Sequence, residues 1–426
     1  MKLLRHKVIC EARKTLKNVE VTVGDTSVPV LVLYTYHYGQ LGVLRSLGRL
    51  GISVNGVDPN PRSPGLFSRY CQKKFLFDVD ASSPQDSVQY LLDIAKRIGK
   101  RSLLVHTTDS GAGWLAENAD ALSAGYIFPK LSKELVYALA NKKDMYFLAK
   151  KFGVPTPEAC FPLSIDDVEE YVKDAVFPVV LKELYRGGSP RVGKRMFVAK
   201  TKAELLKFYS QCEDSSNPNF MLQEYIPGGD DSIWMFNGYF DEKSDCLFGV
   251  TGRKIRQSPI HTGVTSLGVC LKNPVVDEVT RSFMKNIGYK GVLDIGYRYD
   301  MRDGKYKVLD INPRIGSTFR LFVGNNGLDV ARAQYLDLTG QSVPLSESVE
   351  GRKWFVEDRD FVSSFRYHYE KSLTFKQWLM SFRGVKESAW FAWDDLPPFL
   401  MMCARSSRKM LFKTDNTALN PYKLTP

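Results

Sequence analysis

Apolar runs separated by polar and glycine-containing turns divide the first third of the chain into alternating strands and helices. Residues 28–34 form an apolar run that predicts a buried strand. Leucines recurring every third residue predict a helix over 41–50, which Gly51 ends, and residues 52–57 predict the next strand. Two strands joined by a helix in this way indicate a right-handed parallel βαβ unit.

The same alternation continues toward residue 130. A helix is predicted over 88–98, a strand over 102–106 and a helix over 112–121. We therefore predict a doubly wound α/β domain over residues 26–130. Its glycines do not spell G-x-G-x-x-G, which disfavours a dinucleotide site.

The middle of the chain has a different pattern, with one long helix followed by many short strands. Leucine spacing predicts a helix over 132–151, which Gly153 and Pro155 end. Helices are also predicted over 202–211 and 275–287. The predicted strands are 176–181, 195–200, 221–225, 232–240, 246–256, 292–299 and 306–312. This order indicates an α+β region, residues 131–340, built on antiparallel strands.

Two segments flank these regions. Residues 1–25 are polar and basic, and we expect a loosely attached arm. Residues 341–426 form a C-terminal extension rich in Trp, Phe and Arg. Within it, residues 399–413 mix Leu, Met and Phe with basic side chains. That mixture is typical of a helix packed on the protein body, and also of one lying on an anionic membrane.

Composition narrows the class of protein. A chain of 426 residues with 44% hydrophobic and 25% charged residues is typical of a globular protein with several domains. No apolar run predicts a transmembrane segment, and the N-terminus does not read as a signal peptide. The 7 cysteines are scattered singly, which favours a reducing cytoplasm over a disulfide framework. The net charge of +12 is spread along the chain, so we expect no nucleic-acid partner.

The clearest chemical motif is Asp310-Ile-Asn312-Pro-Arg314. In a strand, Asp310 and Asn312 point to the same face, which brings a carboxylate and an amide together. Mg²⁺ prefers such oxygen ligands, and Arg314 could hold an anion beside it. The fragment alone equally fits an ordinary strand that ends in an Asx-Pro turn.

A glycine-rich loop follows a strand that ends in Lys182. Gly188–Lys194 matches G-x-x-x-x-G-K, but Arg195 stands where a P-loop has Ser or Thr, and the loop leads into a strand instead of a helix. We therefore interpret the loop as a hairpin that closes over phosphates with its backbone N–H groups. The alternative is a plain flexible hairpin.

Several charged residues on later strands could share one site. Glu224 and Asp231 flank a Pro-Gly-Gly turn, while Lys254 and Arg256 alternate onto one face of a strand. Asp294 lies one hairpin before Asp310, so the two carboxylates could face the same cation. Taken alone, the Glu224–Asp231 segment is better explained as an ordinary hairpin, and Asp294 could simply neutralise the charge of Arg298.

Their order along the chain is more informative than any single motif. A helix lysine, a strand lysine, a glycine loop, a Glu/Asp hinge, a basic strand, an Asp and finally Asp-x-Asn-x-Arg follow one another. This order resembles the carboxylate–amine ligases of the ATP-grasp superfamily over roughly residues 28–340. The resemblance implies a pre-ATP-grasp domain at 26–130 and a two-lobed ATP-grasp fold at 131–340. In that fold, residues 131–227 would cover the nucleotide and residues 228–340 would bind the metal.

The resemblance also implies roles for individual residues. ATP, with Mg²⁺ or Mn²⁺, would be the cofactors. The nucleotide-binding positions would be Lys142, Lys182, Gly187, Gly188, Ser189, Glu224, Tyr225, Ile226 and Asp231. Asp294, Asp310 and Asn312 would hold the metal, and Arg314, Lys254 and Arg256 would act on the reacting groups. Asp231 and Asp310 stand where the family usually has Glu, which is one methylene longer.

The implied activity is ATP-dependent formation of an amide or peptide-like bond through an acyl-phosphate, with release of ADP and phosphate. The partners would be a small-molecule carboxylate and an amine, at least one of them anionic, and we expect a homodimer. Arg45 and the loop 107–111 face a plausible substrate cleft. The alternative is a non-catalytic nucleotide-binding protein or a protein that associates with a membrane surface.

Overall fold

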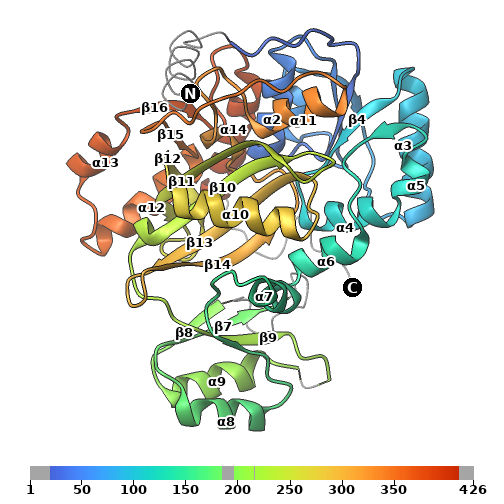
Figure 1. Ribbon diagram of the computed structural model, residues 1–426. Coiled ribbons are helices and arrows are strands. Elements are labelled where there is room, and N and C mark those ends of the chain that lie inside the picture. Colours follow the sequence, from blue (N-terminus) through green and yellow to red (C-terminus); the bar gives the residue numbers. More distant parts are fainter. Residues whose placement is uncertain (1–19, 185–195, 215, 412–426) are drawn as a thin grey trace, which may run out of the picture.

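The computed structural model describes residues 20–184, 196–214 and 216–411, which form three β-sheets with helices around them (Figure 1). A parallel sheet of five strands, a small sheet of four and a large sheet of seven follow from the pairing of the strands. Among these described residues, no helix combines the length and apolar character needed to cross a membrane.

The five-stranded sheet carries the N-terminal domain and is parallel, as the sequence predicts. Its strands are β1 (Val30–Leu33), β2 (Val54–Val57), β3 (Cys71–Phe75), β4 (Ser102–Val105) and β5 (Tyr126–Ile127), in the order β3-β2-β1-β4-β5. Its helical elements are α2 (Tyr38–Gly48), η1 (Pro64–Phe67), α3 (Pro84–Ile98), α4 (Asp109–Glu117) and α5 (Ala119–Leu122). The helix predicted over 112–121 is two helices, broken at Asn118. Strand β3 escaped prediction because three of its five side chains are exposed polar groups.

The helix predicted over 132–151 is also two helices, α6 (Lys133–Ala140) and α7 (Lys142–Lys151). The break falls at Asn141, whose backbone is extended and whose side-chain oxygen accepts a hydrogen bond from the backbone N–H of Lys143 at 2.8 Å. Asparagine is a favoured N-cap because its side chain satisfies an N–H that the helix leaves unpaired. Lys142 is therefore the first residue of α7.

The four-stranded sheet forms a separate lobe, at the bottom of Figure 1. Its strands are β6 (Ala159–Cys160), β7 (Val179–Glu183), β8 (Met196–Ala199) and β9 (Phe220–Glu224), all antiparallel in the order β6-β9-β7-β8. Helices α8 (Ile165–Asp174) and α9 (Lys202–Cys212) pack on it through a core of its own.

The seven-stranded sheet forms the centre of the molecule, in the order β14-β13-β10-β11-β12-β15-β16 (Figure 1). Its first five members are β10 (Ile233–Phe240), β11 (Cys246–Ser258), β12 (Val264–Cys270), β13 (Gly291–Asp300) and β14 (Lys305–Asn312). The short helices η2 (Asp230–Ser232) and η3 (Phe319–Leu321) and the helices α10 (Pro274–Asn286) and α11 (Val330–Leu338) accompany them. These five strands pair antiparallel, as predicted for this region.

The segment after residue 340 contributes the last two strands of that sheet. Strand β15 (Lys353–Phe355) pairs with β12, and β16 (Val385–Ser388) pairs with β15. Helices α12 (Glu357–Tyr369), α13 (Phe375–Ser381) and α14 (Pro397–Leu411) complete it. In α14, Met402 is buried and Phe399 packs against the main core. The apolar side of this helix is thus used inside the protein, as in the first of the two interpretations of residues 399–413.

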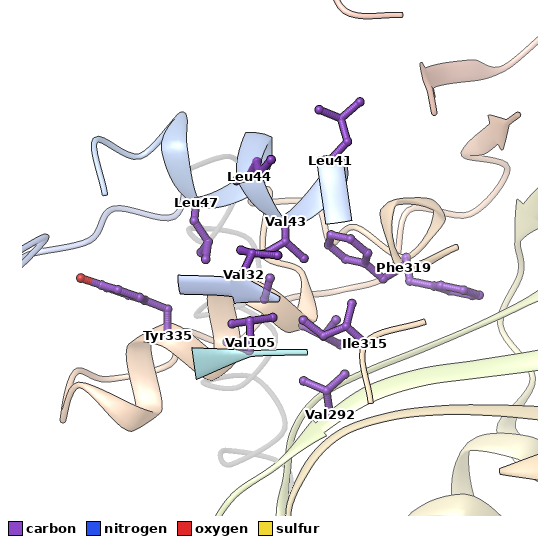
Figure 2. Packing of buried hydrophobic residues seen from close by; sticks show 14 of the residues in the cluster. Val32, Leu41, Val43, Leu44, Leu47, Val105, Val292, Ile315, Phe319 and Tyr335 are labelled. Atoms are coloured by element: carbon purple, nitrogen blue, oxygen red, sulfur yellow. The ribbon is translucent and has the colours of Figure 1, made fainter. Parts of the chain in front are cut away.

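One hydrophobic core joins the parallel domain to the large sheet (Figure 2). Val105 at the end of β4 lies with Val292 of β13 and Ile315, which follows β14 (Figure 2). Burying such side chains stabilises a fold by roughly 1.5–3 kcal/mol each. The chain positions His106, Asp294 and Arg314 therefore stand one or two residues from a shared, rigid core.

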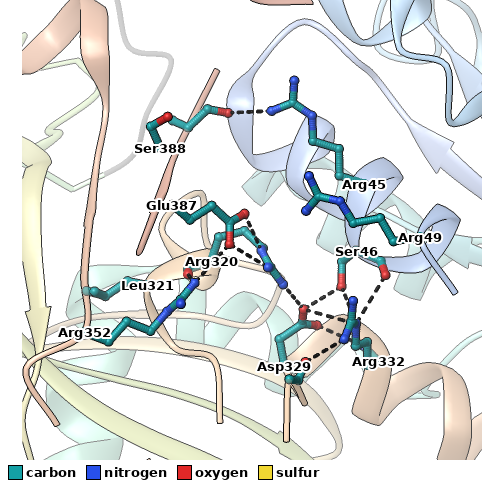
Figure 3. A network of polar contacts seen from close by, with 12 residues as sticks. Arg45, Ser46, Arg49, Arg320, Leu321, Asp329, Arg332, Arg352, Glu387 and Ser388 are labelled. Carbon is teal, nitrogen blue, oxygen red and sulfur yellow. Dashed lines mark hydrogen bonds and ion pairs between the residues drawn. The ribbon is translucent and has the colours of Figure 1, made fainter. Parts of the chain in front are cut away.

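A network of ion pairs, which we call the arginine clamp, also links the parallel domain to the large sheet (Figure 3). Arg320 pairs with Asp329 and, at 2.6 Å, with Glu387 of β16, and Arg352 binds the same Glu387 oxygen at 3.0 Å. Asp329 also accepts a 2.5 Å hydrogen bond from Ser46 of α2. The clamp consists of Arg320, Asp329, Arg352 and Glu387.

Candidate active site

The predicted metal ligands come together on one face of the β13–β14 hairpin. Asp294 is directly opposite Asn312, and Gly296 is directly opposite Asp310. Opposite residues of an antiparallel pair share a face, as do residues two apart in one strand. Asp294, Asp310 and Asn312 therefore project from the same side of the sheet, and the Asn312 amide donates to Asp310 at 3.2 Å.

Two glycines that the sequence analysis did not single out make room for the carboxylates. A Cβ at Gly296 would lie 2.6 Å from Asp310 Oδ1, and one at Gly316 would overlap the carboxylate of Asp294. Both positions therefore exclude larger side chains. The spacing of acidic residues along the chain could not reveal this, because the glycines face the carboxylates across strands and loops.

The carboxylate of Asp294 is electrostatically strained. The pKa of Asp294 is raised to about 6, mainly by burial and also by the negative charge of Asp310, although the charges of Arg314 and Lys254 oppose the shift. Buried Asn237, opposite Asp294 on β10, was not predicted and is a hydrogen-bond partner of this carboxylate. Burial and a like charge both disfavour the ionised form, so a bound cation would relieve the site.

Arg314 joins the hairpin to the N-terminal domain. Its Nε donates to Asp109 Oδ1 at 2.5 Å, and its Nη2 donates to Asn312 Oδ1 at 3.1 Å. Burial acts to lower the pKa of Arg314, but the charges of Asp109, Asp294 and Asp310 outweigh it and raise that pKa. Arg314 is thus a permanently charged guanidinium beside the predicted metal ligands.

Of the two features predicted to face a substrate cleft, the loop 107–111 lies at the site and Arg45 does not. The loop 107–111 contributes Asp109, the partner of Arg314, and Asp109 is the first residue of α4. Arg45 is instead buried against the C-terminal segment, where its Nε pairs with Asp395 Oδ2 at 2.9 Å. The proposed cleft position of Arg45 is therefore wrong, since its charge is consumed by a buried ion pair.

Lys254 and Arg256 do not share a face, which corrects the prediction made from their spacing. The strand register shifts between them, so a β-bulge turns Arg256 away from the site. Burial lowers the pKa of Lys254, while the negative charges of Asp310 and Asp294 act against this shift. Arg256 forms a two-pronged ion pair with Asp360 of α12 at 2.8 Å and is buried there.

Two of the lysines predicted to bind phosphate lie on different elements, Lys142 at the start of α7 and Lys182 on β7 of the small lobe. Lys142 Nζ donates to the backbone oxygen of Leu184 at 3.0 Å. The pKa of Lys182 is lowered to about 8, mainly by burial and also by the positive charge of Lys142, although Asp310 acts against this shift. The charges of Lys142 and Asp310 both act on Lys182, so Lys182 lies within electrostatic range of the predicted metal-ligand face. The predicted loop residues Gly187, Gly188 and Ser189 lie outside the described residues.

The predicted hinge residues lie where β9 leaves the small sheet. Glu224 Oε1 accepts from Lys307 Nζ at 2.6 Å, so its side chain is already engaged with β14. Ile226 is buried, while Tyr225 lies against the guanidinium of Arg298. Asp231 is exposed, with one oxygen 4.0 Å from Arg253. Lys307, the partner of Glu224, was not predicted, because it is 83 positions away along the chain.

A pocket adjoins Arg314 at the junction of the parallel domain and the large sheet. Its lining includes His106, Tyr289, Gln334 and Ile315. Among the described residues, neither His106 Nδ1 nor Gln334 Oε1 has a hydrogen-bond partner, although both atoms are buried. Burial, aided by the charge of Arg314, lowers the pKa of His106 to about 4, so this ring is neutral at pH 7.

The residues present suit Mg²⁺ better than a transition metal. Within the described parts of the chain, no group of three or more His, Cys, Asp or Glu side chains could hold a metal ion. Two carboxylates and an amide are hard oxygen donors, and Mg²⁺ typically takes one or two carboxylates together with substrate phosphates. The strained Asp294–Asp310 pair therefore fits the predicted ion.

Comparison with known sequences finds distant relatives among enzymes. No family model matches the chain. It is 26% identical over 243 residues to D-aspartate ligase of Enterococcus faecium, covering 55% of this chain and 58% of that enzyme. It is also 23% identical over 345 residues to biotin carboxylase 1 of Bacillus subtilis, covering 74% and 72% of the two chains. The matched region thus spans little more than half of the length of the D-aspartate ligase.

Solved structures agree on the fold. Biotin carboxylase from Campylobacter jejuni superposes with a TM-score of 0.60 at 15% identity, over 77% of this chain and 75% of that one. N5-carboxyaminoimidazole synthetase from Staphylococcus aureus, solved with ADP, gives 0.59 at 12% identity over 79% and 83%. L-amino acid ligase from Bacillus licheniformis gives 0.56 at 14% identity over 76% and 78%. The ATP-grasp fold expected from the sequence is thereby confirmed.

Proposed function

We propose that this protein is an ATP-dependent carboxylate–amine ligase that forms an amide bond through an acyl-phosphate. The observation that carries the proposal is the grouping of Asp294, Asp310 and Asn312 on one strand face, with Arg314 bridging them to the N-terminal domain. Such a face joins cation ligands to an anion-binding guanidinium.

The chemistry proceeds in two displacements. A substrate carboxylate oxygen attacks the γ-phosphorus of ATP, and the bond to the bridging oxygen of ADP breaks. The amine nitrogen then attacks the acyl carbon, the carbon–oxygen bond to phosphate breaks, and the nitrogen loses a proton. Inorganic phosphate leaves, and no covalent bond to the enzyme forms.

The protein's contribution is positioning and charge. Mg²⁺ held by Asp294, Asp310 and Asn312 would neutralise phosphate charge. Lys142 and Lys182 bind the phosphates, the Glu224–Ile226 backbone holds the base, and Asp231 binds the ribose. Arg314 orients the substrate carboxylate, and Lys254 stabilises the transferred phosphoryl group. Arg256 has no part in this assignment, because its ion pair with Asp360 buries it elsewhere.

We propose an acidic amino acid as the carboxylate substrate. The D-aspartate ligase relative supports this class, as does the net charge of +12. The unpartnered donors and acceptors beside Arg314, on His106 and Gln334, suit a polar substrate better than an apolar one. Relatives named as carboxylases make bicarbonate the competing acid.

The test is ADP release with D-aspartate, L-aspartate, D-glutamate or bicarbonate, using hydroxylamine as a general amine. A ligase gives a hydroxamate in step with ADP, because hydroxylamine captures the acyl-phosphate. Asp310→Asn should slow turnover by at least about 100-fold, since it removes charge that faces the reacting phosphates. The control Asp303→Asn, in the exposed β13–β14 turn, should keep its activity.

Two outcomes contradict the proposal. Full turnover in Asp310→Asn would show that the strand face carrying Asp310 does not bind the catalytic metal. Release of ADP that depends on bicarbonate, with no hydroxamate from any amino acid, would instead assign a carboxylating reaction.

A further inference from the structure

Helix α12 has polar side chains on its inward face and apolar side chains on its outward face, the reverse of an ordinary surface helix. Its inward face carries polar groups: Asp360 binds Arg256 and accepts from Trp378 Nε1 at 3.1 Å, and Tyr367 is hydrogen-bonded to Asp230. Its outward face carries Phe361, Phe365 and Tyr369, spaced four residues apart. A surface helix normally turns its apolar stripe to the core.

The exposed apolar surface continues onto α13. Side-chain exposure is 62% at Phe365, 89% at Tyr369 and 66% at Phe375. Leu379 and Met380 of α13 are exposed as well. Figure 1 places both helices together at one edge of the molecule. We call these residues of α12 and α13 the aromatic edge.

The aromatic edge is surrounded by positive charge. Between residues 361 and 386 the chain has five lysines and arginines and one glutamate. The basic residues, all exposed, are Arg366, Lys371, Lys376, Arg383 and Lys386. Aromatic rings beside lysines and arginines are the composition with which proteins enter the headgroup region of anionic bilayers.

A second copy of the chain is a poorer occupant. In a two-fold dimer the same patch meets itself, so the basic residues of one copy would face those of the other. Interface cores are also depleted of charged residues. An anionic lipid surface instead neutralises each Lys and Arg while the rings enter the bilayer boundary.

We propose that the aromatic edge of α12 and α13 docks the enzyme on an anionic membrane surface. The docking is peripheral, and it uses a face built from residues outside the candidate active site. Because Arg256, Asp360 and Tyr367 fix α12 from inside, the surface is preformed. This site of attachment is different from α14, whose apolar side packs on the core.

The test is co-sedimentation of the full chain with phosphatidylcholine vesicles and with vesicles that also contain phosphatidylglycerol. The wild type should bind the anionic vesicles and bind the neutral ones at least about tenfold less. Phe365→Ser with Phe375→Ser should reduce binding to anionic vesicles about tenfold or more, since both rings leave the bilayer boundary. Lys371→Glu with Lys376→Glu should remove the preference for anionic lipid.

A matched control uses exposed apolar residues elsewhere. Met301→Ser with Leu345→Ser removes comparable exposed side chains and should bind vesicles like the wild type. Sedimentation velocity without lipid, run on all variants, reports the oligomeric state. Binding of wild type to neither vesicle, or equal binding by the Phe365/Phe375 variant, overturns the proposal. Dissociation of a wild-type dimer by that variant, without vesicle binding, would assign the edge to contact between copies.

Discussion

The candidate active site and the arginine clamp both combine buried carboxylates with basic side chains, yet the pKa values of their carboxylates shift in opposite directions. In the clamp, burial acts to raise the pKa of Glu387, yet Arg320 and Arg352 outweigh it and lower that pKa. In the site, burial raises the pKa of Asp294 to about 6, and Asp310 adds to the shift. Carboxylates in the clamp are satisfied by the protein, whereas those of the site are left to be satisfied by a ligand.

The comparison separates stability from function. A buried carboxylate paired with arginines contributes to holding the fold, and removing it leaves uncompensated charge. A buried carboxylate with too little compensation destabilises the fold and is available for binding. Substitutions in the two regions should therefore act in opposite directions on the free energy of unfolding.

The largest effect is expected in the clamp. Glu387→Gln leaves Arg320 and Arg352 buried without their shared carboxylate and should lower the free energy of unfolding by about 3–5 kcal/mol. Urea denaturation measures this, with Glu347→Gln, an exposed residue, as control. A loss equal to that of the control would show that the clamp contributes nothing to stability.

Strand β11 carries one residue of each kind, because Lys254 faces the candidate site and Arg256 stabilises the fold through its buried ion pair. Lys254→Met should lower turnover about 100-fold, because Lys254 feels the charges of Asp310 and Asp294. Arg256→Met should instead lower stability, because buried Asp360 loses its partner, while turnover per folded molecule is kept. Steady-state kinetics and thermal unfolding of the two variants distinguish these outcomes. A large loss of turnover in folded Arg256→Met would show that Arg256 takes part in the reaction after all.

The smallest effect concerns pH, and its sign is opposite in the two regions. Since the folded-state pKa of Asp294 is raised to about 6, its ionisation destabilises the fold as pH rises from about 4 to 6. Asp294→Asn, measured in EDTA, should therefore be more stable than the wild type at pH 7 and not at pH 4. The stabilisation from Glu387, whose pKa is lowered, is present above the unfolded pKa and lost as pH falls below it. Equal stability differences at both pH values would contradict the strain at Asp294.

The sequence was most informative where the chemistry is local. The i, i+2 spacing of Asp310 and Asn312 and the hairpin to Asp294 are short-range features, and the structure has all three on one face. Seven strands of the middle region were likewise predicted, whereas β6 (Ala159–Cys160) and β12 (Val264–Cys270) were missed.

The predictions that were wrong or incomplete depend on features that the local pattern of residues along the chain does not contain. A β-bulge between Lys254 and Arg256 breaks the two-residue alternation on which their shared face depended. The burial of Arg45 depends on Asp395, 350 positions away along the chain. Gly296 and Gly316 matter only because carboxylates approach them in space.

The division of hydrophobic cores has a consequence for motion. Helix α7, which begins with Lys142, shares a core with the large sheet, whereas β7, which carries Lys182, belongs to the separate core of the small lobe. Units with separate cores are free to move relative to each other. If the small lobe swings to admit ATP, Lys182 travels with it, while Lys142, Asp294 and Asp310 stay in place. The separation between the two lysines is then a natural coordinate for lobe closure, which a pair of probes on α7 and β7 could follow.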